Sequence, residues 1–227
     1  MIGFFRKITF GCLLTAGVGG MASPGVQVYP YENNDMNVFV IEKDSMTFGV
    51  SESQPSDSDF FVNANFFDNS GPIGLVVIDG MRTSNRVRQG GFFYVLNNQA
   101  YVDAATSPRY TEFNAQSILS AIDNGKVNTA LTRARHGKRR TYRTLIGQTQ
   151  NGDIVFIASG RTGLVTISEI IDLAIENNVH DGILLDGGSS VDYRFGRTRF
   201  KSIPNAVKNV MEIEEPKTYI YGNFNDN

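Results

Sequence analysis

The chain has 227 residues, of which 41% are hydrophobic and 19% are charged, and its formal net charge is −2. This composition is typical of a globular protein, and the small net charge excludes a strong overall attraction to nucleic acid or to an anionic membrane. Sixteen Phe and nine Tyr, with no Trp, favour a β-rich core because aromatic residues are enriched in strands.

Residues 1–22 are typical of a secretory signal peptide. Two basic residues precede an apolar run over 8–18, which is too short for a membrane-spanning helix of about 20 residues, and small residues up to Ala22 fit cleavage there. The only cysteine, Cys12, lies in this segment, so the mature chain would hold no disulfide. We therefore expect an exported, periplasmic or extracellular domain over 23–227 that is not inserted in a membrane after cleavage. A retained N-terminal helix or membrane anchor is the alternative.

Short apolar or alternating runs bounded by Gly, Asn, Asp or Pro dominate the first half of the chain, as is typical of strands. A loop with the sequence NANFFDNSGP (63–72) separates two of them. The first predicted helix covers 115–124, where apolar residues recur at i, i+3, i+4 and i+7 and Asn124-Gly125 would end the helix. We expect strands over 38–41, 46–50, 60–62, 73–78 and 91–96.

The second half begins with a basic stretch, TRARHGKRRTYR (132–143), which we interpret as a solvated loop. A strand over 154–158, a helix over 166–177 and a strand over 183–185 then form a β-α-β unit. The later segments are expected as strands over 191–200 and 211–221 and an irregular linker over 202–209. Together these elements predict an α+β fold, in which a single domain holds a mixed β-sheet flanked by helices.

Several common kinds of active site are excluded by the residues present. The two histidines, His136 and His180, lack a metal-ligand spacing such as HxxxH, and no GxSxG motif supports a Ser-His-Asp triad. Neither a P-loop nor a GxGxxG motif occurs. A hydrolase that uses carboxylates, or a binding protein, remains.

The segment ILLDGGSS (183–190) ends a short apolar run at an acid, Asp186, which two glycines and two serines follow. Glycines let a ligand approach the backbone closely, and an acid at a strand end beside bare N–H groups is a common way to bind a sugar or a phosphate. Without further context, a tight Asp-Gly turn is the simpler interpretation.

A second acid, Glu169, lies in TISE (166–169), which has the pattern of a capping box. The loops that follow the strands over 154–158 and 183–185 would open at the same edge of the sheet, so Asp186 and the start of this helix can face one crevice. A helix N-terminus at that place also favours an anion.

Basic and polar residues near these acids are further candidates. Arg143 directly precedes the strand-like TLIGQT and is the best candidate for binding an anion, while Arg161 lies in the loop before the second helix. In the loop over 63–72, the amides of Asn63 and Asn65 suit sugar hydroxyls, although a turn is the simpler interpretation.

In order and spacing, four of these segments resemble the phosphodiester glycosidase family. They are NANFFDNSGPIGLVVIDG (63–80), RTLIGQTQNGDIVFIASG (143–160), GLVTISEIIDLA (163–174) and LLDGGSS (184–190). The resemblance covers about residues 60–196. NAN stands where the family has a double glycine, so Ala64 narrows that loop, and the last motif has two glycines where the family often has three.

The resemblance implies an active site built from these segments. Glu169 and Asp186 would be the active-site acids, and Arg143 would hold the phosphate. The other expected substrate-binding residues are Asn63, Asn65, Phe66 and Phe67 around the sugar and Gly187, Gly188 and Ser189 as the wall.

The implied reaction is hydrolysis of a sugar-1-phosphodiester at the anomeric C–O bond, which would release a free sugar such as N-acetylglucosamine from an envelope or extracellular glycan. A phosphate monoester leaves readily, so Asp186 would act as base or nucleophile with Glu169 as its helper. A non-catalytic carbohydrate-binding surface protein and a phosphodiesterase that cuts the P–O bond are the alternatives. Calcium or magnesium, bound by oxygens of Asp181, Asp186 and Asp192, stays open as a cofactor.

Overall fold

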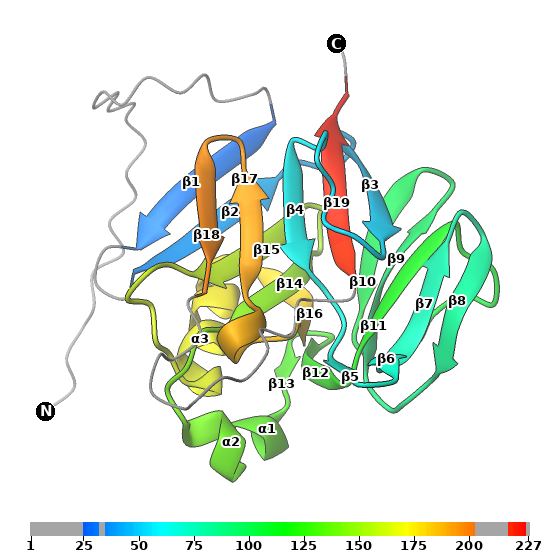
Figure 1. Ribbon diagram of the computed structural model, residues 1–227. Coiled ribbons are helices and arrows are strands. Elements are labelled where there is room, and N and C mark those ends of the chain that lie inside the picture. The colour runs from blue at the N-terminus through cyan, green and yellow to red at the C-terminus, as the bar shows by residue number, and fades with distance from the viewer. Residues whose placement is uncertain (1–24, 32–34, 203–217, 226–227) are drawn as a thin grey trace, which may run out of the picture.

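Figure 1 shows the computed structural model of the protein, which describes residues 25–31, 35–202 and 218–225. The predicted signal peptide, the linker after Ser202 and the first part of the strand expected over 211–221 lie outside these residues. Within the described ranges, no helix is long and apolar enough to cross a membrane.

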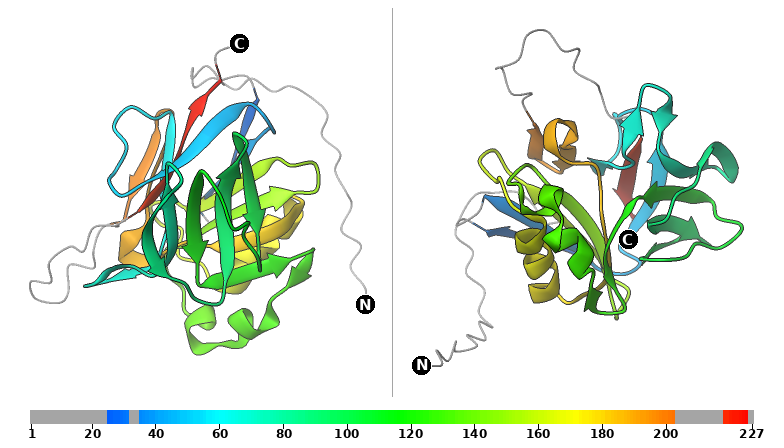
Figure 2. Two further views of the ribbon diagram at one scale, coloured as in Figure 1. Left: turned by 90° about the vertical axis from the view of Figure 1, so that its right-hand side faces the viewer. Right: turned by 90° about the horizontal axis from the view of Figure 1, so that it is seen from below.

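Three β-sheets form the framework, and every strand pairing in the described ranges is antiparallel. The first, seven-stranded sheet has the order β1 (Val26–Tyr31), β2 (Met36–Ile41), β15 (Ile154–Ser159), β14 (Thr144–Thr149), β16 (Val179–Leu184), β12 (Leu119–Asp123) and β13 (Lys126–Val127). The second sheet lies toward the viewer in the left view of Figure 2. Its order is β10 (Gln99–Asp103), β9 (Gly91–Leu96), β11 (Phe113–Ser117), β7 (Gly74–Ile78) and β8 (Met81–Arg86).

The third sheet combines two strands from the early part of the chain with three from its last part. Its order is β18 (Thr198–Lys201), β17 (Asp192–Phe195), β4 (Phe60–Asn63), β19 (Tyr219–Phe224) and β3 (Met46–Ser51). A two-stranded hairpin of β5 (Phe67–Asp68) and β6 (Gly71–Pro72) is separate from the three sheets. The helical elements are α1 (Thr129–Arg133), α2 (Arg135–Lys138), α3 (Ile167–Glu176) and the 3₁₀ turn η1 (Gly188–Ser190).

The seven-stranded sheet is buried on both faces, and each face belongs to a different core. Along β15, Phe156 packs in the core shared with the other sheets, whereas Val155 and Ile157 pack in the core beneath α3. This alternation follows from the two-residue period of a strand. α3 adds Ile167, Ile170 and other buried residues to the second core, and the right view of Figure 2 shows it lying against the outer face of the sheet.

The predicted α+β class with a mixed, helix-flanked sheet is wrong. Strands make up 50% of the described residues and helices only 12%, and the sheets are antiparallel. α3 lies close to the predicted position and joins β15 to β16, which run in the same direction on either side of β14. Because β14 separates them, the predicted β-α-β unit does not form a pair of hydrogen-bonded parallel strands.

The helix predicted over 115–124 is also wrong, since β11 and β12 occupy this stretch. Its apolar spacing arises because the chain passes from one sheet to another, so that Ala115 enters the first core and Ile122 enters the second. Asn124 and Gly125 have φ values of +49° and +73° and form the two-residue turn between β12 and β13. Asn-Gly is a strong hairpin signal as well as a helix stop, and here the hairpin prevails.

The other strand predictions agree with the structure in position. Strands lie at all five places expected in the first half, and β15 and β16 overlap the two expected later. The single strand expected over 191–200 is the hairpin β17–β18, which turns at Gly196 with a φ of +53°.

Candidate active site

The predicted motif ILLDGGSS lies where the three sheets meet. After β16 ends, the backbone N–H of Leu185 donates to Thr144 O at 2.9 Å and that of Asp186 donates to Ala64 O at 3.0 Å. The chain then enters β17, which pairs with β4. Ser117, at the end of β11, donates its hydroxyl to Leu184 O. The Asp186 turn is therefore fixed by all three sheets.

The backbone around Asp186 needs both glycines. Asp186 is half-buried, and its Oδ1 accepts a hydrogen bond from the N–H of Gly187 at 2.9 Å. A side chain at position 187 would place its Cβ 2.8 Å from Tyr142 O. Gly188 has a φ of +65° and donates its N–H to Tyr142 O at 2.9 Å. The tight Asp-Gly turn is thus real, and it also packs bare backbone beside a carboxylate.

The Asn63 amide ties this turn to the third sheet. Its Nδ2 donates to Asp186 O at 2.8 Å and its Oδ1 accepts from the N–H of Asp192 at 3.1 Å, and the side chain is fully buried. The buried Asn63 therefore positions the Asp186 turn, and its contact with a sugar stays a prediction.

Asn65 has a similar role between the loop and the second sheet. Its Nδ2 donates to Gln116 O at 2.8 Å, and its Oδ1 accepts from the hydroxyl of Thr218 at 3.0 Å. Phe66 and Phe67, which follow it, are half-buried and reach the surface. Of the loop residues predicted to line a sugar site, the two phenylalanines are the accessible ones.

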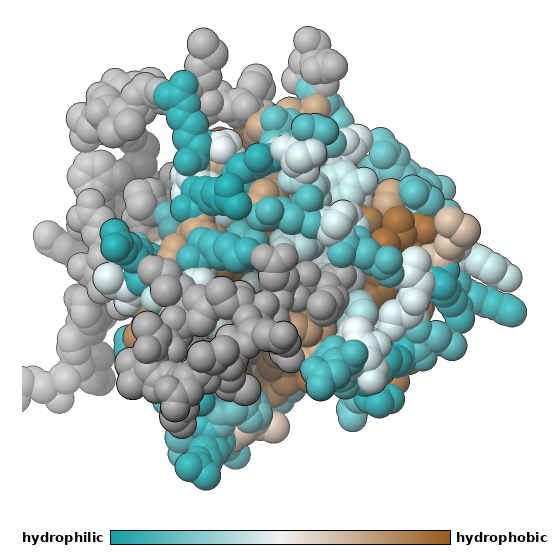
Figure 3. Space-filling model, in the orientation of Figure 1, coloured by the Kyte–Doolittle hydropathy of each residue, from teal (hydrophilic) through white to brown (hydrophobic). Residues whose placement is uncertain are grey.

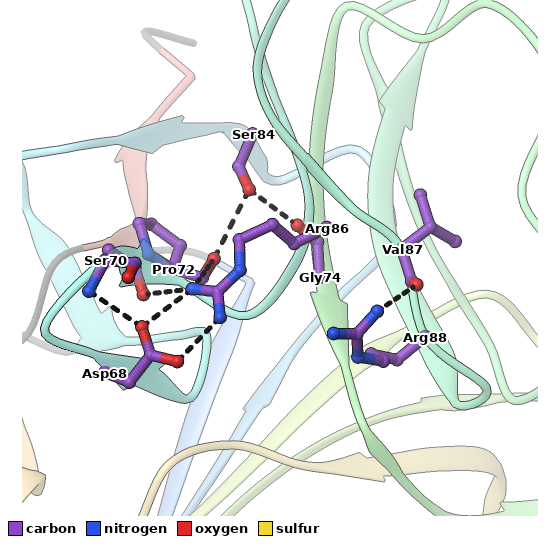
Figure 4. A network of polar contacts seen from close by, with 9 residues as sticks. Asp68, Ser70, Pro72, Gly74, Ser84, Arg86, Val87 and Arg88 are labelled. Atoms are coloured by element: carbon purple, nitrogen blue, oxygen red, sulfur yellow. Dashed lines mark hydrogen bonds and ion pairs between the residues drawn. The ribbon is translucent and has the colours of Figure 1, made fainter.

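An ion pair between Asp68 and Arg86 holds this loop, and no sequence motif indicated that Arg86 would be the partner. Figure 4 shows the Arg86 guanidinium facing the Asp68 carboxylate, with Nη1–Oδ1 at 2.8 Å and Nη2–Oδ2 at 2.6 Å. Arg86 and the N–H of Ser70 hold the pKa of Asp68 at about 2, well below its usual 3.8. Because the two residues are 18 positions apart, only the pairing of β7 with β8 brings Arg86 to the hairpin.

Arg143 lies beside the turn, but part of its guanidinium is already engaged. Nη2 donates to the carbonyls of His136 and Arg139 at 2.7 and 3.1 Å, which anchors α2. Its Nε is buried without a hydrogen-bond partner among the described residues. Burial lowers the pKa of Arg143, and the neighbouring charge of Arg139 lowers it further. No described carboxylate forms an ion pair with it, so its positive charge is not neutralised locally.

Glu169 forms the predicted capping box. Its Oε2 accepts from the N–H of Thr166 at 2.7 Å, and the N–H of Glu169 donates to Thr166 Oγ1 at 3.3 Å. Its Oε1 accepts from Arg140 Nη1 at 2.8 Å. The Thr166 N–H first, and Arg140 second, lower the pKa of Glu169, so this carboxylate is ionised at neutral pH.

The segment Thr141–Arg143 lies between the two predicted acids. Thr141 pairs with Val165, next to the start of α3, while Tyr142 O accepts the N–H of Gly188 on the other side. The hydroxyl of Tyr142 also donates to the carbonyl of Arg161, whose side chain is exposed. The structure thus gathers the motifs containing Arg143, Glu169 and Asp186 around one edge of the seven-stranded sheet. Ser189 is exposed beside them.

The acids proposed as metal ligands are not gathered. Asp181 contacts His180 Nδ1 at 2.8 Å and the N–H of Asn124 at 2.9 Å, at the opposite end of β16 from Asp186. Asp192 is buried and accepts from Gln54 Nε2 at 3.0 Å. Among the described residues, no group of three or more His, Cys, Asp or Glu could hold a metal ion.

Two surface clefts are lined by residues other than the predicted site. One, of about 410 Å³, lies beside Asp79, Tyr110 and Glu112, and the other, of about 660 Å³, lies at the start of β16 beside His180. Asp186, Glu169 and Arg143 line neither of them.

Comparison with known proteins agrees with the motifs. The sequence profile described as phosphodiester glycosidase matches residues 57–213. A search of curated protein sequences finds no match. Among solved structures, the catalytic domain of zebrafish N-acetylglucosamine-1-phosphodiester α-N-acetylglucosaminidase, described as auto-inhibited by its pro-peptide, has a TM-score of 0.67 and 13% identity. The similarity covers 91% of this chain and 86% of that domain.

Two bacterial structures are also similar. A hypothetical protein from Synechocystis has a TM-score of 0.53 and 13% identity, over 87% of this chain and 61% of that one. A Burkholderia pseudomallei protein whose description calls it exported has a TM-score of 0.52 and 10% identity, over 83% of this chain and 73% of that one. At such identities the likeness shows a shared fold.

Proposed function

Because the chain belongs to the phosphodiester glycosidase family, we propose that it hydrolyses sugar-1-phosphodiesters at the anomeric C–O bond and releases the free sugar. The observation that carries this proposal is the Asp186 turn, in which a half-buried carboxylate and a bare Gly187-Gly188 backbone are fixed by all three sheets. The proposed substrate is a glycan phosphodiester outside the cytoplasm.

In the proposed reaction, Asp186 acts either as general base on a water molecule that attacks the anomeric carbon, or as nucleophile on that carbon itself. The bond from that carbon to the phosphate oxygen breaks, the phosphate leaves as a monoester, and the oxygen of water ends on the sugar. The water proton goes to Asp186 if it acts as base. If Asp186 acts as nucleophile, water hydrolyses the covalent intermediate, the Asp186 carboxylate is regenerated and the proton goes to the solvent. A positioned carboxylate contributes roughly 10²–10⁴-fold to such a step.

Arg143 is the proposed binding group for the departing phosphate. Its support is a positive charge that no described carboxylate neutralises and a buried Nε without a partner in the described ranges. A fixed cation at the place where negative charge develops stabilises the transition state more than the ground state.

Glu169 is the proposed helper of Asp186, and it acts indirectly, by holding the segment that positions the Asp186 turn. Its ionised carboxylate binds Arg140, which directly precedes the segment that bonds Gly188. Asn63, Asn65, Phe66 and Phe67 would form the sugar side of the site, with the phenylalanines as the accessible surface.

Hydrolysis in ¹⁸O-labelled water tests the bond that is cut. With an N-acetylglucosamine-1-phosphodiester as substrate, cleavage of the C–O bond places the label in the free sugar. Release of a sugar phosphate that carries the label in its phosphate group would show that a phosphodiesterase had cut the P–O bond. Saturable sugar binding without any turnover would instead favour a carbohydrate-binding protein.

The variant Asp186→Asn should lose at least about a hundredfold in kcat, because the amide is neither a base nor a nucleophile. Asp172→Asn, an exposed acid on α3, is the matched control and should keep full activity. Thermal unfolding of both variants separates lost chemistry from lost folding. Unchanged turnover by a folded Asp186→Asn variant would refute the assigned role.

A further inference from the structure

Positive charge is concentrated in one segment of a chain that is acidic overall. Residues 124–152 contain seven Lys and Arg and no Asp or Glu. The whole chain has 21 basic and 23 acidic residues, so the other positions hold 14 basic residues against the same 23 acids. Such separation of charge produces a local positive field that the small net charge conceals.

Most of these cations are exposed and unpaired in the described part of the chain. Arg133, Arg135, Lys138 and Arg139 are all exposed, and none forms an ion pair there. Arg140 alone pairs, with Glu169 at 2.8 Å. Like charges in such a cluster repel one another and attract ligands of opposite charge, so the cluster favours an anionic partner.

The cluster is continuous with the Asp186 turn. It extends over α1 and α2 at the bottom of Figure 1, where Figure 3 shows a hydrophilic surface. From there the chain runs through Arg140 and Thr141 into Tyr142, whose carbonyl accepts the N–H of Gly188. Only Thr141 and Tyr142 lie in the sequence between these cations and Arg143, the residue proposed to bind the departing phosphate.

We propose that the basic segment 133–140 binds the anionic chain of a phosphodiester-linked glycan and holds it across the Asp186 turn. The substrate would then be a polymer with several phosphodiesters, of which one lies at Asp186 while its neighbours lie on α1 and α2. This inference rests on the proposed function for the chemistry at Asp186, but the binding itself does not require turnover.

The chemistry of the segment favours a glycan over nucleic acid or a membrane. Proteins that bind single-stranded nucleic acid stack bases on exposed aromatic rings. Tyr142 is the only Phe, Tyr or Trp within 124–152, and its ring packs against Phe200 with centroids 5.3 Å apart. A membrane-surface helix needs an extended apolar face. α1 and α2 have five and four residues, with Gly137 as their one buried residue.

The test measures binding of an end-labelled poly(N-acetylglucosamine-1-phosphate) chain to the inactive but full-length Asp186→Asn protein by fluorescence anisotropy. The variant Arg133→Gln/Arg135→Gln/Lys138→Gln/Arg139→Gln should weaken binding at least about tenfold at low salt. The matched control removes four exposed cations elsewhere, at Lys43, Arg82, Arg109 and Arg199, and should change binding less than about twofold.

Activity and salt complete the experiment. Without the Asp186→Asn change, the segment variant should hydrolyse a single sugar-1-phosphodiester at the wild-type rate but lose efficiency on the polymer. Polymer binding should weaken steeply with salt, because each phosphate contact releases counterions. An uncharged chitin oligomer of the same length should not bind to the segment.

Each outcome decides one question. Equal loss in the two quadruple variants would overturn the proposal, as would equal affinity for duplex DNA or anionic vesicles, which would indicate a generic polyanion surface. Polymer binding through the segment by a wild-type protein that hydrolyses no substrate would refute the proposed function and keep the inference. Turnover of the small substrate without any preference for the polymer would support the proposed function and refute the inference about the basic segment.

Discussion

The two carboxylates at the sheet edge are held in different ways. The Asp186 turn is tied by the buried Asn63 amide and Ala64 carbonyl and by the carbonyl of the half-buried Tyr142. Glu169 is tied at the surface, by its own helix cap and by the exposed Arg140. Removing one partner of a buried hydrogen bond lowers the free energy of unfolding substantially, whereas an exposed ion pair contributes little to it. We therefore expect changes at Asp186 to be severe and changes at Glu169 to be mild.

Among changes to the residues that hold the two carboxylates, Asn63→Ala is expected to have the largest effect on the free energy of unfolding. Removing the amide leaves the buried Asp186 carbonyl and Asp192 N–H without their partner, which should lower the free energy of unfolding by about 3 kcal/mol. Urea unfolding measures this loss, and kcat should fall with it even at temperatures where the variant is folded. Asn85→Ala, on the exposed face of β8, is the control and should be nearly neutral. A stability close to wild type would show that the Asp186 turn does not depend on this tie.

Gly187→Ala should come next. The new Cβ would lie 2.8 Å from Tyr142 O, a backbone atom that cannot turn aside, so about 1–3 kcal/mol of stability and at least about tenfold in kcat should be lost. Gly196→Ala serves for comparison, since its φ of +53° strains alanine although no atom lies near. That variant should lose some stability and no activity. Equal activity of the two variants would show that catalysis does not depend on the backbone geometry of the Asp186 turn.

The Asp68–Arg86 ion pair is expected to act on binding. Asp68→Asn frees the hairpin that begins at Phe67, directly after Phe66, so KM should rise severalfold while kcat is unchanged. The folded-state pKa of Asp68 is depressed to about 2, so its contribution is complete above its usual pKa of 3.8 and is lost as the pH falls through about 2. The difference in melting temperature between wild type and variant should therefore be constant at neutral pH, shrink as the pH falls below 3.8 and be largely lost by about pH 2. A difference that persists there would exclude the carboxylate charge as its cause.

Glu169→Gln should have the smallest effect. The amide oxygen can still accept from the Thr166 N–H, and only the exposed pair with Arg140 is lost, which contributes about 0.5 kcal/mol. Because the pKa of Glu169 is lowered on folding, this contribution is present above its unfolded pKa and disappears as the pH falls through the folded value. Steady-state kinetics should show kcat within about threefold of wild type. A hundredfold loss would make Glu169 a catalytic acid and end the contrast with Asp186.

Local signals in the sequence predicted local structure well. The TISE pattern indicated a capping box, and Thr166 and Glu169 form it. Strand positions followed from short apolar runs between turn residues. The helix over 115–124 failed because the same apolar spacing fits two strands that face different cores, and spacing alone does not say how many cores a segment meets.

The candidate site was predicted only in part. Its motifs were visible because glycine, acid and amide types stand out in the sequence. The use of Asn63 and Asn65 as buried ties was not visible, since the partners that link them to Gln116, Asp186, Asp192 and Thr218 lie 51 to 153 positions away. The ion pair of Arg86 with Asp68 had no motif at all.

The sequence by itself determined the family, the helix cap at Glu169 and the Asp-Gly turn at 186–188, because each depends on residues close together in the chain. Only the tertiary structure decided that three antiparallel sheets meet at this turn and that Asn63 is buried there while Glu169 stays at the surface. The physical reason is that burial and hydrogen-bond partners over long separations depend on how sheets pack, and strand patterns leave that packing open.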